Sequence, residues 1–204
     1  QKKTVVIMNP LTDKLPNPYF GVREKKIVCF ARLHKQKNLP LLIQAFAQVH
    51  RKHPEYKLKI YGNGEEKEHL LQLIHNLKLE DAASIYPFSD NIHSDILQAN
   101  VFVLPSDYEG LSNSMLEAMA LGIPTVCTDC PCGGARMVIQ DHVNGMLVPV
   151  GDCDGLVKAI NELIENEVLA RKLSECSVEI RKRLNSSAIC GEWIEAIDVH
   201  TAYN

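Results

Sequence analysis

The chain has 204 residues, of which 46% are hydrophobic and 23% are charged, and its formal net charge is −3. That length suffices for one substantial domain, or for one domain with a tail. The sequence holds no run of 18 apolar residues and no visible signal peptide, so we expect a cytoplasmic protein without a membrane span. Its slight acidity argues against nucleic acid as a partner.

The first 22 residues carry several prolines and are predicted to be a linker, with a short strand at 5–7. Strands and helices alternate after it. The predicted strands cover 26–31, 57–61, 84–88, 101–105, the end of 122–127, and 146–148. The predicted helices cover 38–53, 65–77, 92–99, 115–121, a short piece within 132–139, 154–165, 168–183 and 187–200.

Short strands that alternate with helices indicate an α/β fold with a doubly wound, mostly parallel, Rossmann-like sheet and helices on both faces. Ligands bind such sheets beyond the carboxyl ends of the strands. We therefore expect the functional residues in the loops at that edge. These loops are 31–37, 61–65, 87–92, 105–113 and 128–136.

Two acids flank the start of the helix that follows the apolar strand 101–105. Glu109 lies in the strand-to-helix loop, and Glu117 is surrounded by apolar residues within the helix. A carboxylate in that setting loses hydration and needs partners, while the free N–H groups of a helix start suit an anion. The pattern predicts a site for a phosphorylated, polyhydroxylated ligand. Two alternatives stay open: Ser114 and Glu117 form a capping box, and Glu109 is an ordinary loop acid.

Arg32 and Lys37 follow the first clear strand, where a phosphate would lie. Arginine offers a planar fork of donors and lysine a mobile charge, which together suit two phosphate groups. The alternative is a solvated basic loop. Gly62-Asn63-Gly64 begins like a dinucleotide fingerprint, but Lys67 stands where the third glycine belongs, so a nicotinamide enzyme is not expected.

The seven cysteines are scattered, and we expect reduced thiols. Cys127, Cys130, Cys132 and Cys153 lie close enough in sequence to suggest a zinc site, but their spacing does not repeat the C-x-x-C ligand pattern. We therefore predict no metal site. The histidines at 34, 93 and 142 are interpreted as solvated or structural.

Together these segments resemble the C-terminal, nucleotide-sugar-binding domain of family-four retaining glycosyltransferases, which have the GT-B fold. Residues 30–38 resemble the G-R-L-x-x-x-K segment of that family, and 61–64 its V-G-x-G turn. Residues 105–120 match its E-x7-E motif with both flanks. Segments 122–126, 133–134 and 144–148 continue in the family's order, so that the resemblance covers roughly residues 5–165.

The resemblance implies catalytic roles for Arg32, Lys37 and Glu109. The two cations would hold the diphosphate and stabilise the charge on the leaving nucleotide, and Glu109 would bind hydroxyls of the donor sugar. Glu117 would bind the ribose. Donor-binding backbone groups would come from Gly110, Leu111, Ser112 and Asn113. Residues near the base would be Gly62, Phe88 and Ser89. No metal or other cofactor is implied.

Two positions depart from the family pattern, since Ala31 replaces the usual glycine before the arginine and Met137 stands where the family often has glutamate. The family's other Rossmann-like domain, which binds the acceptor, is not seen. We thus expect residues 1–22 to be an interdomain hinge, 23–185 the nucleotide-sugar-binding domain, and 186–204 a helix that packs against the other domain. Alone, this chain is expected to bind donor weakly and to transfer no sugar.

The function predicted from this resemblance is transfer of a sugar from a nucleotide-sugar donor, with UDP favoured, to a glycan or lipid-linked acceptor in surface polysaccharide synthesis. A location at the inner face of a membrane, with peripheral association of the full-length protein, is compatible with such an acceptor. Two alternatives remain: a GT-B-like nucleotide-sugar epimerase, and a non-catalytic nucleotide-sugar-binding module.

Overall fold

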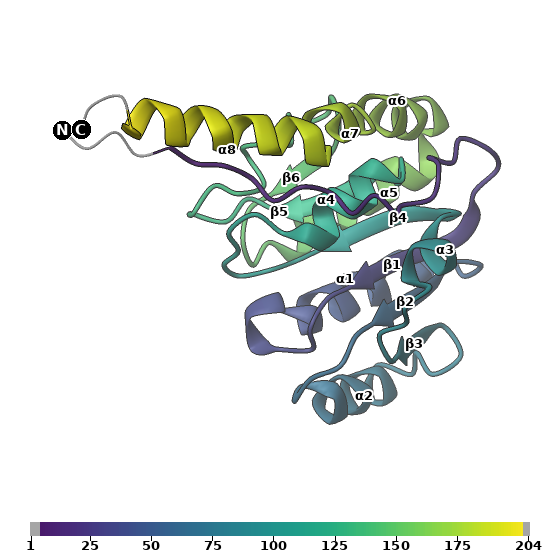
Figure 1. Cartoon of the computed structure of the whole chain (residues 1–204). Helices are drawn as coiled ribbons and strands as arrows, with labels where there is room; N and C mark the ends of the chain where they lie inside the picture. The colour runs from purple at the N-terminus through teal and green to yellow at the C-terminus, as the bar shows by residue number, and fades with distance from the viewer. Residues whose placement is uncertain (1–4, 202–204) are drawn as a thin grey trace.

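A six-stranded parallel sheet forms the centre of the computed structural model, which describes residues 5–201 (Figure 1). The strand order is β3-β2-β1-β4-β5-β6, and every neighbouring pair runs parallel. The strands are β1 (Glu24–Phe30), β2 (Lys57–Tyr61), β3 (Ala83–Tyr86), β4 (Ala99–Leu104), β5 (Thr125–Thr128) and β6 (Met146–Val148). The predicted fold class is confirmed, with a sheet that is parallel throughout.

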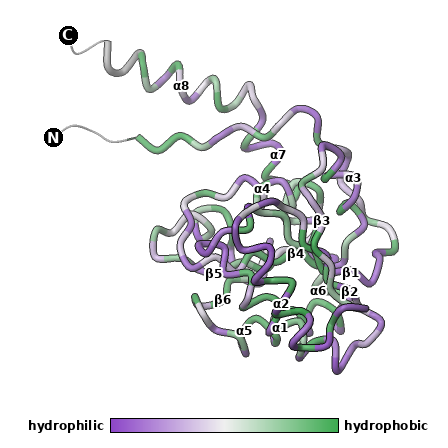
Figure 2. The backbone as a smooth tube through the Cα atoms, turned by 90° about the horizontal axis from the view of Figure 1, so that it is seen from below, coloured by the Kyte–Doolittle hydropathy of each residue, from purple (hydrophilic) through white to green (hydrophobic). Residues whose placement is uncertain are grey.

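Helices cover both faces of this sheet. They are a 3-10 turn η1 (Lys35–Lys37), α1 (Leu39–Lys52), α2 (Lys67–Asn76), α3 (Ile92–Ile96), α4 (Asn113–Ala120), α5 (Cys153–Glu165), α6 (Glu167–Ser177), α7 (Ile180–Arg183) and α8 (Ser186–Thr201). The β1–α1–β2 and β4–α4–β5 crossovers proceed in opposite directions along the sheet, so right-handed connections place α1 and α4 on opposite faces. In Figure 2, α1, α2 and α5 lie together at one side and α3, α4 and α7 at the other.

The central strands are buried on both faces, as their near-continuous apolar sequences require. Ile27 and Val28 of β1 and Phe102 and Val103 of β4 have no exposed surface. The rings of Phe30 and Phe102 pack with centroids 5.2 Å apart at the carboxyl ends of these two strands. The middle of the sheet, where β1 and β4 pair, is therefore fully buried.

Four predicted elements differ from the observed ones. Residues 5–7 form no strand, because Val5 and Val6 are exposed and pair with no neighbouring strand. The helix predicted at 92–99 ends at Ile96, since β4 already begins at Ala99. Residues 134–138 form consecutive turns instead of a helix. The helix predicted at 168–183 is split into α6, which ends at Ser177, and α7, which begins at Ile180. At the break, the Ser177 hydroxyl donates to the Ser174 carbonyl, a side-chain bond of the kind that competes with helical backbone bonds.

The segment before the sheet is bound to the helical layer above β4 and β5. Leu11 N–H donates to the Leu184 carbonyl at 2.8 Å, and Tyr19 N–H donates to the Leu121 carbonyl at 3.2 Å. Figure 1 shows this segment passing beside α8 and α4. The predicted division at 22/23 and 185/186 remains a prediction. In the described range, no helix combines the length and apolarity needed to cross a bilayer.

A partly buried arginine, Arg23, fastens the amino-terminal edge of the sheet, and the sequence analysis did not single it out. The Arg23 guanidinium donates to the carbonyls of Tyr19 at 2.7 Å, Ala99 at 2.9 Å and Gly122, and to Ser174 Oγ at 3.0 Å. Burial lowers the pKa of Arg23 to about 10. One side chain thereby joins the linker, β4, the α4–β5 turn and α6.

Candidate functional site

The candidate site lies between β1 and β4, where the strand order reverses. The chain leaves β1 toward one face of the sheet and leaves β4 toward the other, so the loops that follow diverge and leave a cleft, as in other doubly wound sheets. The cleft has a volume of about 620 Å³. Its lining consists of Asn9, Phe30, Ala31, Arg32, Lys37, Gly62, Asn63, Phe88, Glu109, Leu111, Ser112, Asn113, Ser114 and Glu117.

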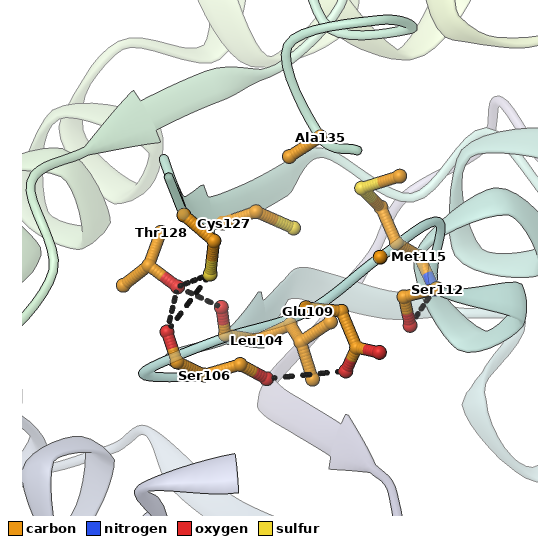
Figure 3. Close-up of a pocket in the computed structure, with 10 residues that line it drawn as sticks. Leu104, Ser106, Glu109, Ser112, Met115, Cys127, Thr128 and Ala135 are labelled. Carbon is orange, nitrogen blue, oxygen red and sulfur yellow. Dashed lines mark hydrogen bonds between the residues drawn. The ribbon is translucent and has the colours of Figure 1, made fainter. Parts of the chain in front are cut away.

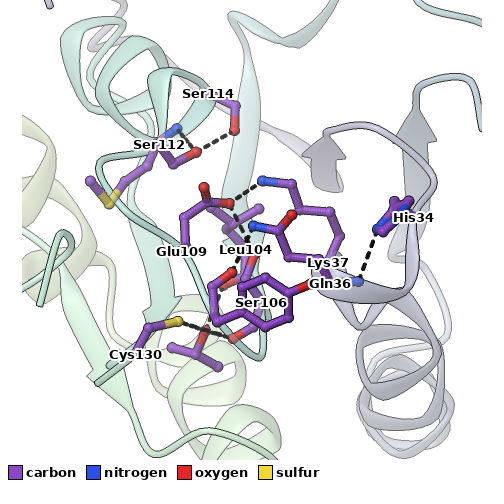
Figure 4. Close-up of polar contacts among 12 residues, drawn as sticks. His34, Gln36, Lys37, Leu104, Ser106, Glu109, Ser112, Ser114 and Cys130 are labelled. Carbon is purple, nitrogen blue, oxygen red and sulfur yellow. Dashed lines mark hydrogen bonds and ion pairs between the residues drawn. The ribbon is translucent and has the colours of Figure 1, made fainter. Parts of the chain in front are cut away.

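Lys37 and Glu109 form an ion pair across this cleft, and Figure 4 shows the two side chains pointing at each other. Only 10% of the Lys37 side chain and 19% of the Glu109 side chain are exposed. Ser106 Oγ lies 3.5 Å from the same carboxylate oxygen of Glu109. The pair is therefore shielded from bulk water, which strengthens the attraction between its charges.

The loops that carry this pair are fastened to each other. Gln36 Nε2 donates to the Tyr108 carbonyl at 2.8 Å, and the Gln36 carbonyl accepts from Asp107 N–H at 2.9 Å. Asn38, which has a left-handed backbone with φ 43°, donates through its side-chain amide to Asp107 Oδ1 at 2.6 Å. These bonds fix the positions of Lys37 and Glu109 before any ligand binds.

Arg32 supplies the second positive charge of the cleft. Among the side chains that the structure describes, at residues 5–197, that of Arg32 has no ion-pair or hydrogen-bond partner. The positive charge of Lys37 is balanced by Glu109, whereas that of Arg32 is not balanced. An unbalanced guanidinium in a cleft is suited to bidentate contacts with phosphate oxygens.

Glu117 is held by a histidine and does not cap its own helix. Its Oε2 lies 2.9 Å from His93 Nε2 on α3, and about one fifth of each side chain is exposed. The N-cap of α4 is Ser112, whose hydroxyl accepts from Met115 N–H at 3.5 Å. The capping-box alternative is therefore wrong in this structure. No local pattern in the sequence indicates His93 as the partner of Glu117.

The start of α4 borders the cleft through Leu111, Ser112 and Asn113. Gly110 does not line the cleft. It lines a second, small cavity of about 10 Å³, and Glu109 borders both spaces (Figure 3). Thr128 Oγ1 donates to the Ser106 carbonyl at 2.6 Å in the wall of that cavity. The cavity holds about one water molecule, so the ligand-sized space is the cleft in front of Glu109.

The glycine-rich segment after β5 supports the Glu109 loop from behind. A Cβ atom added to Gly134 would lie 1.8 Å from the Gly110 carbonyl oxygen, so only glycine allows the two backbones to come this close. Cys132 Sγ donates to the Glu109 carbonyl at 2.6 Å. Neither Gly133 nor Gly134 lines the cleft, so these glycines serve the turn after β5 and do not bring backbone to the ligand space.

The residues predicted near the base are only partly brought together. Gly62 and Phe88 line the cleft, whereas Ser89 does not. The Ser89 hydroxyl instead accepts from Asn91 N–H at 3.1 Å, at the start of α3. A Cβ atom added to Gly62 would lie 1.9 Å from the Ala31 carbonyl oxygen, so Gly62 allows the loops after β1 and β2 to touch.

All seven cysteines are free thiols. Burial raises the pKa of Cys29 to about 12 and also raises that of Cys127. Within residues 5–201, no three side chains of histidine, cysteine, aspartate or glutamate converge in a way that would hold a metal ion. Cys153 Sγ accepts a bond from the Gln48 side-chain amide at 3.8 Å.

Comparison with known families identifies the chain. The family model for glycosyl transferases group 1 matches residues 16–180. The chain belongs to this glycosyltransferase family. It has the fold of one half of a GT-B enzyme and corresponds to the C-terminal half of its relatives, as the resemblance predicts.

Two curated relatives match the chain, one named as a phosphotransferase and one as a sugar transferase. The chain is 34% identical over 179 residues to an exopolysaccharide phosphotransferase of Streptomyces coelicolor, covering 87% of this chain and 19% of that protein. It is 33% identical over 151 residues to the N-acetylgalactosamine-N,N'-diacetylbacillosaminyl-diphospho-undecaprenol 4-alpha-N-acetylgalactosaminyltransferase of Campylobacter jejuni, covering 74% of this chain and 40% of that protein.

Solved structures show the same architecture. A mutant of S. aureus TarM, crystallised with fondaparinux, alpha-GlcNAc-glycerol and UDP, superposes with a TM-score of 0.85 at 26% identity. That match covers 94% of this chain and 38% of TarM. The chain spans between 19% and 53% of the length of its curated relatives.

Proposed function

We propose that this chain is the donor-binding domain of a retaining glycosyltransferase that uses a UDP-linked sugar. The observation that carries the proposal is the convergence of Arg32, Lys37, Glu109 and Glu117 on one cleft at the carboxyl edge of the sheet. The cleft combines one unbalanced cation, one shielded ion pair and one carboxylate held by histidine. This set matches a ligand that has both phosphate and hydroxyl groups.

Each group has a role that follows from its chemistry. Arg32 and Lys37 would bind the diphosphate and stabilise the negative charge that develops as the bond from sugar to phosphate breaks. The start of α4 would add its N–H groups and the positive end of its dipole. Glu109 would accept hydrogen bonds from the sugar hydroxyls, and Glu117 would do so from the ribose, which positions the donor.

Two cations within one cleft favour a reaction without a resident metal. Arg32 and Lys37 would supply the positive charge that a divalent ion supplies to phosphates in other enzymes. We therefore propose metal-independent binding and transfer. Equal affinity for UDP in buffers with excess Mg²⁺ and with EDTA supports this part of the proposal, and loss of binding in EDTA contradicts it.

The acceptor side of the proposal rests on the relatives. The C. jejuni relative is named for a sugar carried on diphospho-undecaprenol, and the S. coelicolor relative for exopolysaccharide. We propose a glycan or lipid-linked acceptor in surface polysaccharide synthesis, held by a second domain against which the exposed Trp193 and Ile194 of α8 would pack. Such an acceptor would bring the full-length protein to the cytoplasmic face of a membrane.

Calorimetric titration with UDP, GDP, ADP and their sugar derivatives tests donor binding. We expect UDP and UDP-sugars to bind, and Arg32→Ala to weaken UDP binding about thirtyfold, the equivalent of about 2 kcal/mol for a lost charge-assisted contact. Arg51→Ala is the matched control, because Arg51 is exposed in the last turn of α1 and does not line the cleft. Absence of binding by every nucleotide contradicts the proposal, as does equal weakening by both variants.

A further inference from the structure

The contact between Glu117 and His93 joins helices α4 and α3. Glu117 lies on α4, between residues that are buried against the sheet, and His93 lies on α3. The 2.9 Å separation of His93 Nε2 and Glu117 Oε2 is a hydrogen-bond distance. About four fifths of each side chain is buried, with 20% of His93 and 22% of Glu117 exposed.

The direction of this bond is fixed by its chemistry. An ionised carboxylate only accepts hydrogen bonds, so His93 Nε2 carries the proton and donates it to Oε2. In the described part of the chain, Oε1 of Glu117 has no protein partner. Since Glu117 lines the cleft, one of its oxygens is held by the protein and the other is left for a ligand.

His93 is itself held in place from two sides. Its ring meets Phe30 edge to face, with centroids 6.4 Å apart and planes 87° apart, and Phe30 belongs to the wall of the cleft. Its helix is anchored by the buried Ile92 and Ile96 and by the Ser89 hydroxyl, which accepts from Asn91 N–H. The imidazole is therefore a fixed donor, with little freedom to follow Glu117 if that side chain moves.

We propose that His93 is a positioning residue that orients Glu117 for a vicinal diol of the ligand. A free glutamate side chain samples many rotamers and loses that freedom on binding, whereas a carboxylate already held at one oxygen loses less. The inference rests on the proposed function, because it takes the diol to be the ribose of the nucleotide. His93 would not contact the ligand itself and would act on it through Glu117.

The test compares UDP with 2′,3′-dideoxyuridine diphosphate, which keeps the base and the diphosphate but lacks both ribose hydroxyls. His93→Phe keeps a ring against Phe30 and removes the donor. We expect this variant to weaken UDP binding about tenfold, as for one lost preorganised hydrogen bond, and to leave the affinity for the dideoxy nucleotide within about twofold. His93→Gln, whose amide restores an N–H donor, is expected to recover most of the UDP affinity.

A second measurement distinguishes loss of Glu117 orientation from a general disturbance of the binding site. In a Glu117→Gln background, His93→Phe is expected to cause no further loss of UDP affinity, because the group it orients is gone. Equal weakening of both nucleotides by His93→Phe, or an unchanged UDP affinity, overturns the inference while leaving the proposed function intact. If the parent chain binds neither nucleotide, the proposed function fails and the inference fails with it.

Discussion

Lys37 and Glu109 are 72 positions apart in the sequence, and their ion pair spans the point where β1 and β4 send the chain to opposite faces of the sheet. Each would leave a poorly hydrated charge behind if the other were removed. A bound diphosphate would offer Lys37 a second anion, and a bound sugar would offer Glu109 hydroxyl donors. In the unliganded cleft, Lys37 and Glu109 therefore balance each other's charge, and a ligand would offer each of them a new partner.

A double-mutant cycle on Lys37→Ala and Glu109→Ala measures this pair. We expect a coupling free energy of about 1–3 kcal/mol in urea unfolding, because the pair is mostly shielded from water. The control cycle uses Lys182 and Glu179, an exposed pair on the helical layer with side chains 79% and 63% exposed. That cycle is expected to give less than about 0.5 kcal/mol. Similar values from both cycles would show that Lys37 and Glu109 are not shielded.

Gly134→Ala tests the close contact between the two glycine loops. The added methyl group would lie 1.8 Å from the Gly110 carbonyl oxygen, so one loop must move. We expect a loss of about 1–3 kcal/mol of unfolding free energy, as for overpacking, together with weaker UDP binding because Glu109 shifts. Gly191→Ala on α8 is the control, since nothing lies within 4 Å of its added Cβ. That variant is expected to be neutral or about 0.5–1 kcal/mol more stable, and equal losses would contradict the contact.

Replacing Arg23 by methionine tests the arginine clamp at the opposite edge of the sheet. The carbonyls of Tyr19 and Ala99 would lose the Arg23 donor, whereas that of Gly122 would keep the Ser174 hydroxyl, and an unsatisfied carbonyl costs about 1–3 kcal/mol. We expect the unfolding free energy to fall by about 3 kcal/mol or more, measured by urea unfolding, and UDP affinity in the folded state to stay unchanged. Arg23→Lys is expected to recover only part of the loss, because one ammonium cannot reach all four acceptors. Full stability in Arg23→Met would contradict the clamp.

The buried thiols predict how stability changes with alkaline pH. Burial raises the pKa of Cys29 from 9.0 to about 12, so the folded state keeps a proton that the unfolded state releases above pH 9. The unfolding free energy is therefore expected to fall as pH rises above 9, by about 1.4 kcal/mol per pH unit for each such thiol. Urea unfolding at several values between pH 8 and pH 10 measures the slope. The double variant Cys29→Ala, Cys127→Ala should flatten it, and an unchanged slope would assign the effect to other groups.

Much of the fold could be predicted because its signals are local. The strands at 57–61 and 146–148 have the predicted bounds, since the first alternates polar and apolar residues, the second is a short apolar run, and both lie between turn residues. The cap of α4 was harder, because Ser112 and Ser114 are both suitable N-caps and only the path of the loop after β4 decides between them. The helix expected after Gly134 fails because Asn144 Nδ2 bonds to the Val138 carbonyl and draws the chain into turns.

The contacts that arrange the site are long-range, and no local pattern announces them. His93 is 24 positions from Glu117, so its sequence setting is that of an ordinary loop histidine. Asn9 lines the cleft from the segment predicted to be a linker. Arg23 has its acceptors in four separate segments. These roles depend on which elements become neighbours after folding, and the strand order decides that.

Binding of the donor nucleotide in the cleft between β1 and β4 is tested most directly by locating bound UDP. Backbone-amide chemical shifts of the isotope-labelled chain, followed during a titration with UDP, map this location. We predict the largest shifts at Gly62, at Gly110–Asn113 at the start of α4, and near Arg32 and Lys37. Saturable shifts confined to another surface, such as the hollow between Asp129 and Val150 beside β6, would contradict it.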